Sequence, residues 1–376
     1  MCICAASNLY VAKYTVALAE VLHPSYQHQG WHTWLVSCAV SLVALFLNLP
    51  GGFKLMPYFT GTAVVSVNAV AVFFIVALLA RAQPKQSASV VFVDVVNESG
   101  WDSLGVVFFL SMLPGVACLG AFDAALHLTD ELPKPTKQVP QVMLGSLGLG
   151  AATGVATILI LGFCNVNPET LLNPVGGMPL VQLFVEAYDS TPLVVASTVL
   201  MIIALTICTT NCLTSWSRLY RSFSRSGMIP FHSWTSKLSS SDSLPINALL
   251  WNTVLADAIT AIEIGSPQAL NAIVGSVGVF SILSFVLSLG LLLYQGREQS
   301  LDPDRWFNLG RWGVLVHCVA LVWCAFVSVW VCFPLYMPMT PGSANYTAAV
   351  VIGFTAVAGL YWVCRFTLAG GPVRST

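Results

Sequence analysis

The sequence predicts an all-α integral membrane protein with about ten transmembrane helices, in a single domain that covers residues 1–376. Hydrophobic residue types make up 56% of the chain and charged ones only 8%, whereas a soluble globular domain has about 25% charged residues. Ten stretches are also mainly apolar over the roughly 20 residues that a spanning helix needs. They lie near 3–22, 32–49, 58–80, 103–128, 142–164, 192–214, 246–264, 270–294, 313–333 and 347–366.

Polarity differs among the ten stretches. The first is the most polar, because it carries Asn8, Lys13 and Glu20. Lys13, and Asp257 in the seventh stretch, are charged groups at membrane depth, which are costly there unless they are paired. Lys13 can alternatively extend its ammonium group to the membrane surface. The last two stretches are apolar on every side, so we expect lipid around much of their surface.

Lysine and arginine are distributed unequally among the connections, which predicts the orientation of the chain. If the N-terminus is cytoplasmic, the outer connections hold only Arg81 and Lys85. The inner connections and the C-terminal end then hold Lys54, Lys134, Lys137, Arg218, Arg221, Arg225, Lys237, Arg297, Arg305, Arg311, Arg365 and Arg374. We therefore expect both termini in the cytoplasm, and the plasma membrane as the location.

Two glycosylation sequons agree with this orientation. Asn97 begins an Asn-Glu-Ser sequence and Asn345 begins an Asn-Tyr-Thr sequence. Both fall in outer connections, where a sequon can be modified. Asn97 and Asn345 are therefore candidate glycosylation sites.

The stretch from Gly115 to Met143 has the features of a ligand site inside the membrane. Pro114, Gly115 and Gly120 weaken a helix at membrane depth, and Asp123 places a carboxyl group there. Opened helix ends present N–H and C=O dipoles to a ligand, and an intramembrane acid is functional by default. The predicted substrate-binding residues are Gly115, Ala117, Cys118, Gly120, Ala121, Phe122 and Asp123. The alternative is a close contact between helices at the glycines.

Three side chains of this stretch carry the predicted chemistry. The ring face of Phe122 can bind an ammonium group. Asp123 and His127 are four residues apart, so they share a face of an α-helix and are proton-coupling candidates. For His127 alone, a structural hydrogen bond is the favoured interpretation.

Polar side chains also recur near the end of the sixth stretch. Thr206, Thr209, Thr210 and Asn211 place hydroxyl and amide oxygens within one and a half helical turns. These oxygens could complete a cation site or contact a substrate. Polar residues of this kind more often join neighbouring helices through hydrogen bonds.

Basic residues follow the sixth stretch in the longest inner connection. Arg218, Arg221 and Arg225 recur at three- and four-residue spacing, which predicts one face of a helical extension that ends at Gly227. One interpretation is an anchor at the anionic inner leaflet. The other is a cytoplasmic gate that pairs with Asp130 or Glu131.

The outer connection 165–191 contains a short apolar piece, PLVQLFVEAY, between proline and glycine breaks. This pattern predicts a short amphipathic helix on the outer surface, or an extracellular lid.

The sequence does not support a catalytic site, a cofactor or metal site, or a nucleic-acid interface. The sequence has no HExxH, GxSxG or nucleotide-binding P-loop motif, so we expect no catalytic residues and no cofactor, and any transport would draw on an ion gradient. His23, His28 and His32 surround Pro24 and are interpreted as an ordinary polar loop rather than a metal site. The formal net charge of −1 says nothing about nucleic acid, and no run of basic residues suggests a phosphate-binding face, so we expect no nucleic-acid partner.

Two longer motifs resemble those of the amino acid–polyamine–organocation (APC) superfamily of permeases. The run GAFDAALHLTDELPKPTKQVP is similar to the sixth-helix signature of that family, although Ala121 stands where the family usually has glycine. The segment TSWSRLYRSFSRSGMIPFHSW is similar to the end of the eighth helix. HPSYQHQGWHTWLV and VNESGW resemble the fungal branch that holds choline and GABA permeases.

This resemblance covers nearly the whole chain and implies a fold and a function. It implies the inverted-repeat transporter fold of the superfamily, truncated at the N-terminus, because the 103–128 stretch matches the sixth helix and the first two helices have no counterpart. The implied function is alternating-access transport of a small amine or amino acid, such as choline or GABA, coupled to protons. The alternative is a non-transporting permease that regulates or assembles with a full-length partner.

Overall fold

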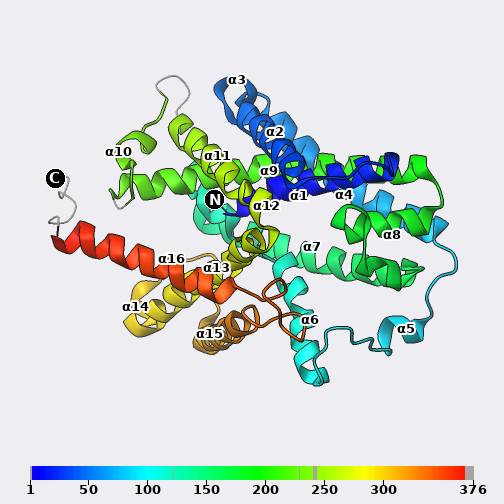
Figure 1. The fold of residues 1–376 in the computed structure, drawn as a ribbon. Helices are drawn as coiled ribbons and strands as arrows, with labels where there is room; N and C mark the ends of the chain where they lie inside the picture. The colour runs from blue at the N-terminus through cyan, green and yellow to red at the C-terminus, as the bar shows by residue number, and fades with distance from the viewer. Residues whose placement is uncertain (1, 121, 228, 240–243, 369–376) are drawn as a thin grey trace. The chain divides into compact units, whose positions relative to one another are not determined.

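The computed structural model describes residues 2–120, 122–227, 229–239 and 244–368, and all regular secondary structure in these ranges is helical (Figure 1). Within them, ten helical segments are long and apolar enough to cross a membrane, which confirms the ten predicted spans. They are Cys2–Leu22, Gly30–Asn48, Gly61–Arg81, Leu104–Leu126, Pro135–Cys164, Thr191–Arg225, Ile246–Gly265, Pro267–Gln295, Gly310–Trp330 and Thr347–Arg365.

Helix bounds differ from the expected ones where helices continue beyond the apolar run. α7 (Pro135–Cys164) begins before residue 142, and α9 (Thr191–Arg225) continues well past residue 214, which confirms the helical extension predicted from the spacing of its arginines. The expected bounds followed the apolar residues alone, whereas a helix keeps its own backbone hydrogen bonds after it leaves the hydrocarbon region. The extension of α9 carries the three predicted arginines and ends before Gly227, which has a φ of +71°.

Contacts divide the chain into two compact units, and each is described by itself. Unit 1 comprises residues 1–95 and 152–270, and unit 2 comprises residues 96–151 and 271–376. α7 and α13 (Pro267–Gln295) contribute to both. Short helices lie between the spans: α3 (Pro50–Phe53), α5 (Ala88–Phe92), η2 (Pro168–Leu172), η3 (Val175–Gly177), α10 (His232–Thr235) and α14 (Arg297–Ser300). Two more form the ends of spans, α12 (Ile262–Gly265) at the end of the seventh and η4 (Gly310–Trp312) at the start of the ninth.

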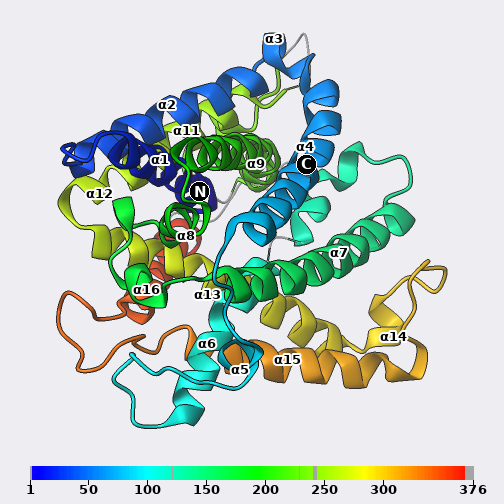
Figure 2. The same cartoon turned by 90° about the vertical axis from the view of Figure 1, so that its right-hand side faces the viewer.

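The centre of unit 1 is a group of four helices with polar inner faces. α1 (Cys2–Leu22), α2 (Gly30–Asn48), α9 and α11 (Ile246–Thr260) all contact one another (Figure 2). Small and polar residues allow helices to approach closely in a membrane and to hydrogen-bond across their interfaces. The polar residues buried on these helices are Asn8, Thr33, Ser37, Ser41, Asn48, Ser197, Thr198, Thr209, Thr210, Ser217, Ser224, Asn252, Thr253 and Thr260.

A second cluster of unit 1 is apolar and is built around α8 (Pro179–Tyr188). The ring of Phe184 lies 5.3 Å from that of Phe74 on α4 (Met56–Arg81) and 5.2 Å from that of Tyr188. Burial raises the pKa of the Tyr188 phenol above its usual value. The predicted helix in the connection 165–191 is confirmed, and its apolar face packs on α4 and α9. Protein atoms cover this face because the connection folds back onto other helices of unit 1.

Unit 2 contains an aromatic cluster between α6 (Leu104–Cys118) and α15 (Gly313–Trp330). The ring of Phe109 lies 5.1 Å from that of Phe326 and 4.9 Å from that of Trp330. The indole N–H of Trp101 donates to the carbonyl of Pro334 at 3.2 Å. These contacts hold the entry to α6 against the end of α15. α16 (Thr347–Trp362) follows and continues as a π-helical turn, η5 (Val363–Leu368).

A buried arginine organises the connection between α13 and α15. Arg297 is 7% exposed, and its Nη1 donates to Glu298 at 2.8 Å and to the carbonyl of Gly310 at 3.1 Å. A Cβ atom at Gly313 would collide with the guanidinium group, so a larger residue there would require the Arg297 side chain to move. This connection is therefore packed around a charged centre rather than around apolar residues.

Candidate substrate and coupling residues

The fourth span is interrupted at the predicted position. α6 passes through Pro114 and ends at Cys118, and a 3₁₀ helix, η1 (Phe122–Glu131), begins four residues later. The N–H of Leu119 still bonds the carbonyl of Gly115 at 3.3 Å, whereas the N–H of Gly120 bonds that of Ala117 at 3.1 Å. The pattern therefore changes from α-helical to 3₁₀ bonding at Gly120. A change of this kind exposes backbone groups that an uninterrupted helix would pair.

The predicted substrate-binding residues surround this interruption. Gly115, Ala117, Cys118 and Gly120 are exposed within unit 2. Phe122 and Asp123 are half-buried, and Ala121 lies outside the described residues. A methyl group added at Gly115 would meet no atom within 4 Å, so this glycine is not required by the packing described for unit 2. A role of these residues in substrate binding stays a prediction.

Phe122 has an aromatic partner that the sequence did not indicate. Its ring is stacked on that of Phe285 of α13, with the centroids 5.8 Å apart and an angle of 12° between the planes. One face of the Phe122 ring is therefore covered by Phe285. The stacked pair joins the start of η1 to α13.

The helix type changes the relation between Asp123 and His127. Both lie in η1, which has about three residues per turn. Positions four apart are then about a third of a turn away from each other, so the shared face expected for an α-helix is absent. The side chain of His127 lies outside the described residues, and a proton-coupling role for either residue stays a prediction.

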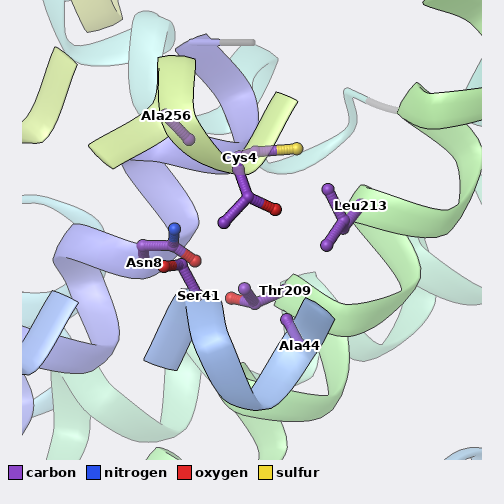
Figure 3. Close-up of a pocket in the computed structure, with 8 residues that line it drawn as sticks. Cys4, Asn8, Ser41, Ala44, Thr209, Leu213 and Ala256 are labelled. Atoms are coloured by element: carbon purple, nitrogen blue, oxygen red, sulfur yellow. The ribbon is translucent and has the colours of Figure 1, made fainter. Parts of the chain in front are cut away.

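The polar residues of α9 have different environments. The hydroxyl of Thr206 donates to the carbonyl of Ile202 at 2.7 Å, and that of Thr210 donates to the carbonyl of Thr206 at 2.9 Å. Asn211 is half-buried. Thr209 is 1% exposed, and its hydroxyl has no hydrogen-bond partner among the described residues. Thr206 and Thr210 therefore bond their own helix, whereas Thr209 turns its hydroxyl toward neighbouring helices (Figure 3).

The three arginines of the predicted gate lie on the last turns of α9. Nη1 of Arg218 donates to the carbonyl of Thr214 at 3.1 Å, and its guanidinium lies 5.5 Å from the ring centre of Phe53. Nε of Arg221 donates to the carbonyl of Ser236 at 3.3 Å, and Arg225 is exposed. The side chains of Asp130 and Glu131 lie outside the described residues. The gate and the lipid anchor both stay open as predictions.

Sequence reasoning missed the partner of Lys13. Its Nζ lies 3.3 Å from Oε1 of Glu263, and the two side chains are 26% and 9% exposed. Lys13 is thus partly buried and paired with a carboxylate inside unit 1. Glu263 lies in α12, directly after α11, and is 250 residues away from Lys13 along the chain. No local pattern therefore connects the two residues. Asp257, the other charged group at membrane depth, accepts a hydrogen bond from Ser41 at 3.0 Å.

Two histidines near the start of α2 are also bonded to nearby side chains. Nδ1 of His28 lies 2.6 Å from a carboxylate oxygen of Glu20, and Nδ1 of His32 lies 2.7 Å from the hydroxyl of Tyr26. Across the described ranges, no three His, Cys, Asp or Glu side chains are grouped as metal ligands.

The two sequons differ in exposure. Asn97 is exposed, and its Oδ1 accepts from the backbone N–H and the hydroxyl of Ser99. Asn345 is half-buried, and its Nδ2 donates to the carbonyls of Val331 and Phe333, each at 2.8 Å. Glycosylation of either residue stays a prediction, and Asn97 is the more accessible of the two.

Comparison with known proteins agrees with these features. The chain is 25% identical over 360 residues to a choline transporter of Saccharomyces cerevisiae, which covers 95% of this chain and 63% of the yeast protein. It is 25% identical over 358 residues to a putative amino acid/polyamine transporter of Macrophomina phaseolina, covering 93% of this chain and 77% of that protein. An amino-acid permease of Arabidopsis thaliana is 26% identical over 275 residues, covering 71% and 52%.

The chain therefore spans between about half and three quarters of the length of these relatives. The sequence model of the family described as "Amino acid permease" matches residues 1–355. Members of this family are transporters rather than enzymes, which agrees with the lack of a catalytic motif. The ten apolar spans and the interrupted fourth span agree with this match. The chain therefore belongs to the amino acid permease family of multi-pass membrane proteins.

Proposed function

We propose that the protein is a secondary active transporter of a small amine or amino acid, such as choline or GABA, that works by alternating access coupled to protons. The observation that carries this proposal is the interruption between Cys118 and Phe122 at membrane depth, in a chain of the permease family. Broken spans are how secondary transporters form a substrate site near the bilayer midplane. Similarity to a choline transporter and to a putative amino acid/polyamine transporter supports the substrate class.

In this proposal, the interruption supplies the substrate contacts. Free N–H groups at an opened helix end attract a carboxylate, and free C=O groups attract an ammonium group. Gly115, Ala117, Cys118, Gly120, Ala121 and Phe122 contribute backbone or ring contacts, and Asp123 binds the amine or takes up the coupling proton together with His127. Thr206, Thr209, Thr210 and Asn211 act as further polar contacts, and Arg218, Arg221 and Arg225 act with Asp130 and Glu131 at a cytoplasmic gate.

The orientation and the location belong to the same proposal. Both termini lie in the cytoplasm of a plasma-membrane protein, with Asn97 and Asn345 outside the cell. The unequal distribution of basic residues among the connections supports this orientation.

The test is uptake by the purified chain in liposomes with an imposed pH gradient, using labelled choline, GABA and a panel of amino acids. We expect saturable uptake of one class of substrate, driven by the gradient and abolished by a protonophore. Asp123→Asn should raise the substrate KM by about tenfold or more, because a hydrogen bond to a charged group contributes roughly 1.5–3 kcal/mol. It should also weaken the dependence of uptake on pH.

A pair of glycine substitutions separates substrate contact from folding. Neither Gly115 of α6 nor Gly145 of α7 has an atom within 4 Å of an added Cβ. Gly115→Ala should lower uptake, because the new methyl group blocks the approach of a substrate to the backbone, whereas Gly145→Ala should leave it unchanged. Equal uptake by both variants would reject the proposed contact.

An alternative function is regulation or assembly with a full-length permease, without transport by this chain. We consider this alternative because the chain spans 63% of the length of the yeast choline transporter and 52% of that of the Arabidopsis permease. If the folded wild-type chain moves no substrate of the panel under any pH gradient, stand-alone transport is wrong and this alternative takes its place.

A further inference from the structure

The connection between α13 and α15 brings two guanidinium groups to one amide oxygen. Oδ1 of Asn308 accepts from Nη2 of Arg297 at 3.4 Å and from Nη2 of Arg305 at 2.8 Å. Arg297 is only 7% exposed, and Nε of both arginines is buried without an acceptor among the described residues. Two positive charges that share a neutral acceptor repel each other, and burial strengthens the repulsion. A negative charge is therefore needed beside this arginine pair.

Glu298 supplies one negative charge to the arginine pair. Its carboxylate oxygens lie 2.8 Å from Nη1 of Arg297 and 3.8 Å from Nη2 of Arg305. The side chain of Glu298 is 77% exposed, so water weakens its attraction to both guanidinium groups. The arginine pair therefore keeps an excess of one positive charge, and the carboxylate beside it is accessible to replacement by another anion.

The other two acids of the connection do not offset this excess directly. Asp302 and Asp304 are exposed, and neither carboxylate forms an ion pair within the described ranges. Nη1 of Arg305 bonds the backbone carbonyl of Asp302 at 2.9 Å rather than its carboxylate. Residues 296–312 as a whole contain three arginines and three acids. The positive excess is therefore local to the arginine pair and is not a property of the entire connection.

Exposed aromatic side chains flank the connection where the two spans end. Tyr294 at the end of α13 is 89% exposed, and Trp306, Phe307 and Trp312 near the start of the ninth span are 43–57% exposed. Tryptophan and tyrosine gather at the level of the lipid headgroups. The guanidinium of Arg311, an exposed residue, lies 5.6 Å from the ring centre of Trp312. The aromatic residues therefore indicate that the connection lies at the depth of the lipid phosphates.

We propose that this connection binds the phosphate group of an anionic phospholipid in the cytoplasmic leaflet, through Arg297, Arg305 and Arg311. The phosphate takes the place of Glu298 beside the arginine pair, and the exposed aromatic rings pack on the apolar part of the lipid. The cytoplasmic leaflet carries the anionic lipids, and basic pockets on that side of a membrane protein suit their headgroups. The choice of leaflet rests on the orientation proposed above, whereas binding in detergent depends on neither orientation nor uptake.

The test titrates the purified full chain in detergent with dioctanoyl phosphatidylserine, dioctanoyl phosphatidylcholine or inorganic phosphate. Bound lipid is measured by native mass spectrometry, and thermal unfolding is followed in parallel. We expect saturable binding of phosphatidylserine, at least about tenfold tighter than that of phosphatidylcholine. The melting temperature should rise by about 2–4 °C or more, because a ligand that binds only the folded state stabilises it. Equal affinities for the two lipids would overturn the proposal, and equal stabilisation by inorganic phosphate would show a site for a free anion instead of a lipid.

Variants of exposed residues locate the site without removing the buried arginine. Arg311→Gln should weaken the binding of phosphatidylserine by about fivefold, as expected for roughly 1 kcal/mol per basic residue at an anionic surface, and Arg311→Lys should retain most of the affinity. Arg81→Gln is the matched control, because Arg81 at the end of α4 is also exposed and lies in a predicted outer connection.

Glu298→Gln separates lipid binding from a purely structural role of the arginine pair. It should strengthen the binding of phosphatidylserine, because it removes the carboxylate that competes for Arg297 and Arg305. Unchanged affinity of Glu298→Gln, or an equal loss of affinity in Arg311→Gln and Arg81→Gln, would contradict the proposed site.

Discussion

Asn48 offers a direct test of how α2 and α9 are held together. It is 1% exposed, and its Nδ2 donates to the carbonyl of Ala44 at 2.9 Å and to that of Thr210 at 3.2 Å. Its Oδ1 accepts a proton from the hydroxyl of Thr214 at 2.6 Å. One side chain of α2 therefore makes two hydrogen bonds to α9.

The expected cost of Asn48→Ala follows from these two bonds. Hydrogen bonds between membrane helices contribute about 0.6 kcal/mol each on average and up to about 1.7. Two of them give about 1.2 kcal/mol, with an upper limit near 3.4. We expect the lower value, because the hydroxyl of Thr214 also lies 2.9 Å from the carbonyl of Thr210 and can pair with it after Asn48 is removed.

The assay is thermal unfolding in detergent, where each kcal/mol corresponds to a shift of about 2–4 °C. Asn68→Ala is the matched control, because Asn68 of α4 is exposed and its Nδ2 donates to the carbonyl of Val64 in its own helix, at 2.7 Å. A double-mutant cycle of Asn48→Ala with Thr214→Val should give a coupling of at least about 0.5 kcal/mol. If the two asparagine variants melt alike, or if the cycle is additive, the bonds between α2 and α9 do not contribute as argued.

Two further predictions concern packing within unit 1. Lys13→Met should destabilise the protein by more than the double variant Lys13→Met/Glu263→Gln does, because the single variant leaves a buried carboxylate without its cation. The free-energy cost of Lys13→Met should stay below the roughly 3–5 kcal/mol expected when a fully buried pair is broken, since Lys13 is 26% exposed. Equal melting temperatures of the single and double variants would contradict this. Gly176→Ala should lower the melting temperature more than Gly177→Ala does. Both glycines have a positive φ, +57° and +68°, so the backbone strain of an added side chain is similar. The difference is that a Cβ at Gly176 would lie 2.5 Å from Cα of Ala17, whereas a Cβ at Gly177 would meet no atom within 4 Å. Similar melting temperatures of these two variants would show that the close approach of Gly176 to Ala17 of α1 does not contribute to stability.

The sequence by itself determined the features that depend on local composition. A bilayer requires about 20 apolar residues for each span, so the ten spans could be counted from the apolar stretches alone. Pro114, Gly115 and Gly120 likewise indicated where the fourth span would weaken, because glycine and proline disturb the helix in which they lie. The extension of α9 past residue 214 followed from the spacing of its arginines.

Only the tertiary structure decided which polar groups meet. Lys13 and Glu263 are separated by 250 residues, and neither local pattern nor spacing could pair them. Thr206 and Thr209 are the same residue type within one turn, yet one hydroxyl bonds its own helix and the other lies at a cavity shared by four helices. The change from an α-helix to a 3₁₀ helix at Phe122 also altered which residues share a face with Asp123. The physical reason is that a hydrogen bond between helices depends on rotation and distance, which the fold sets and composition does not.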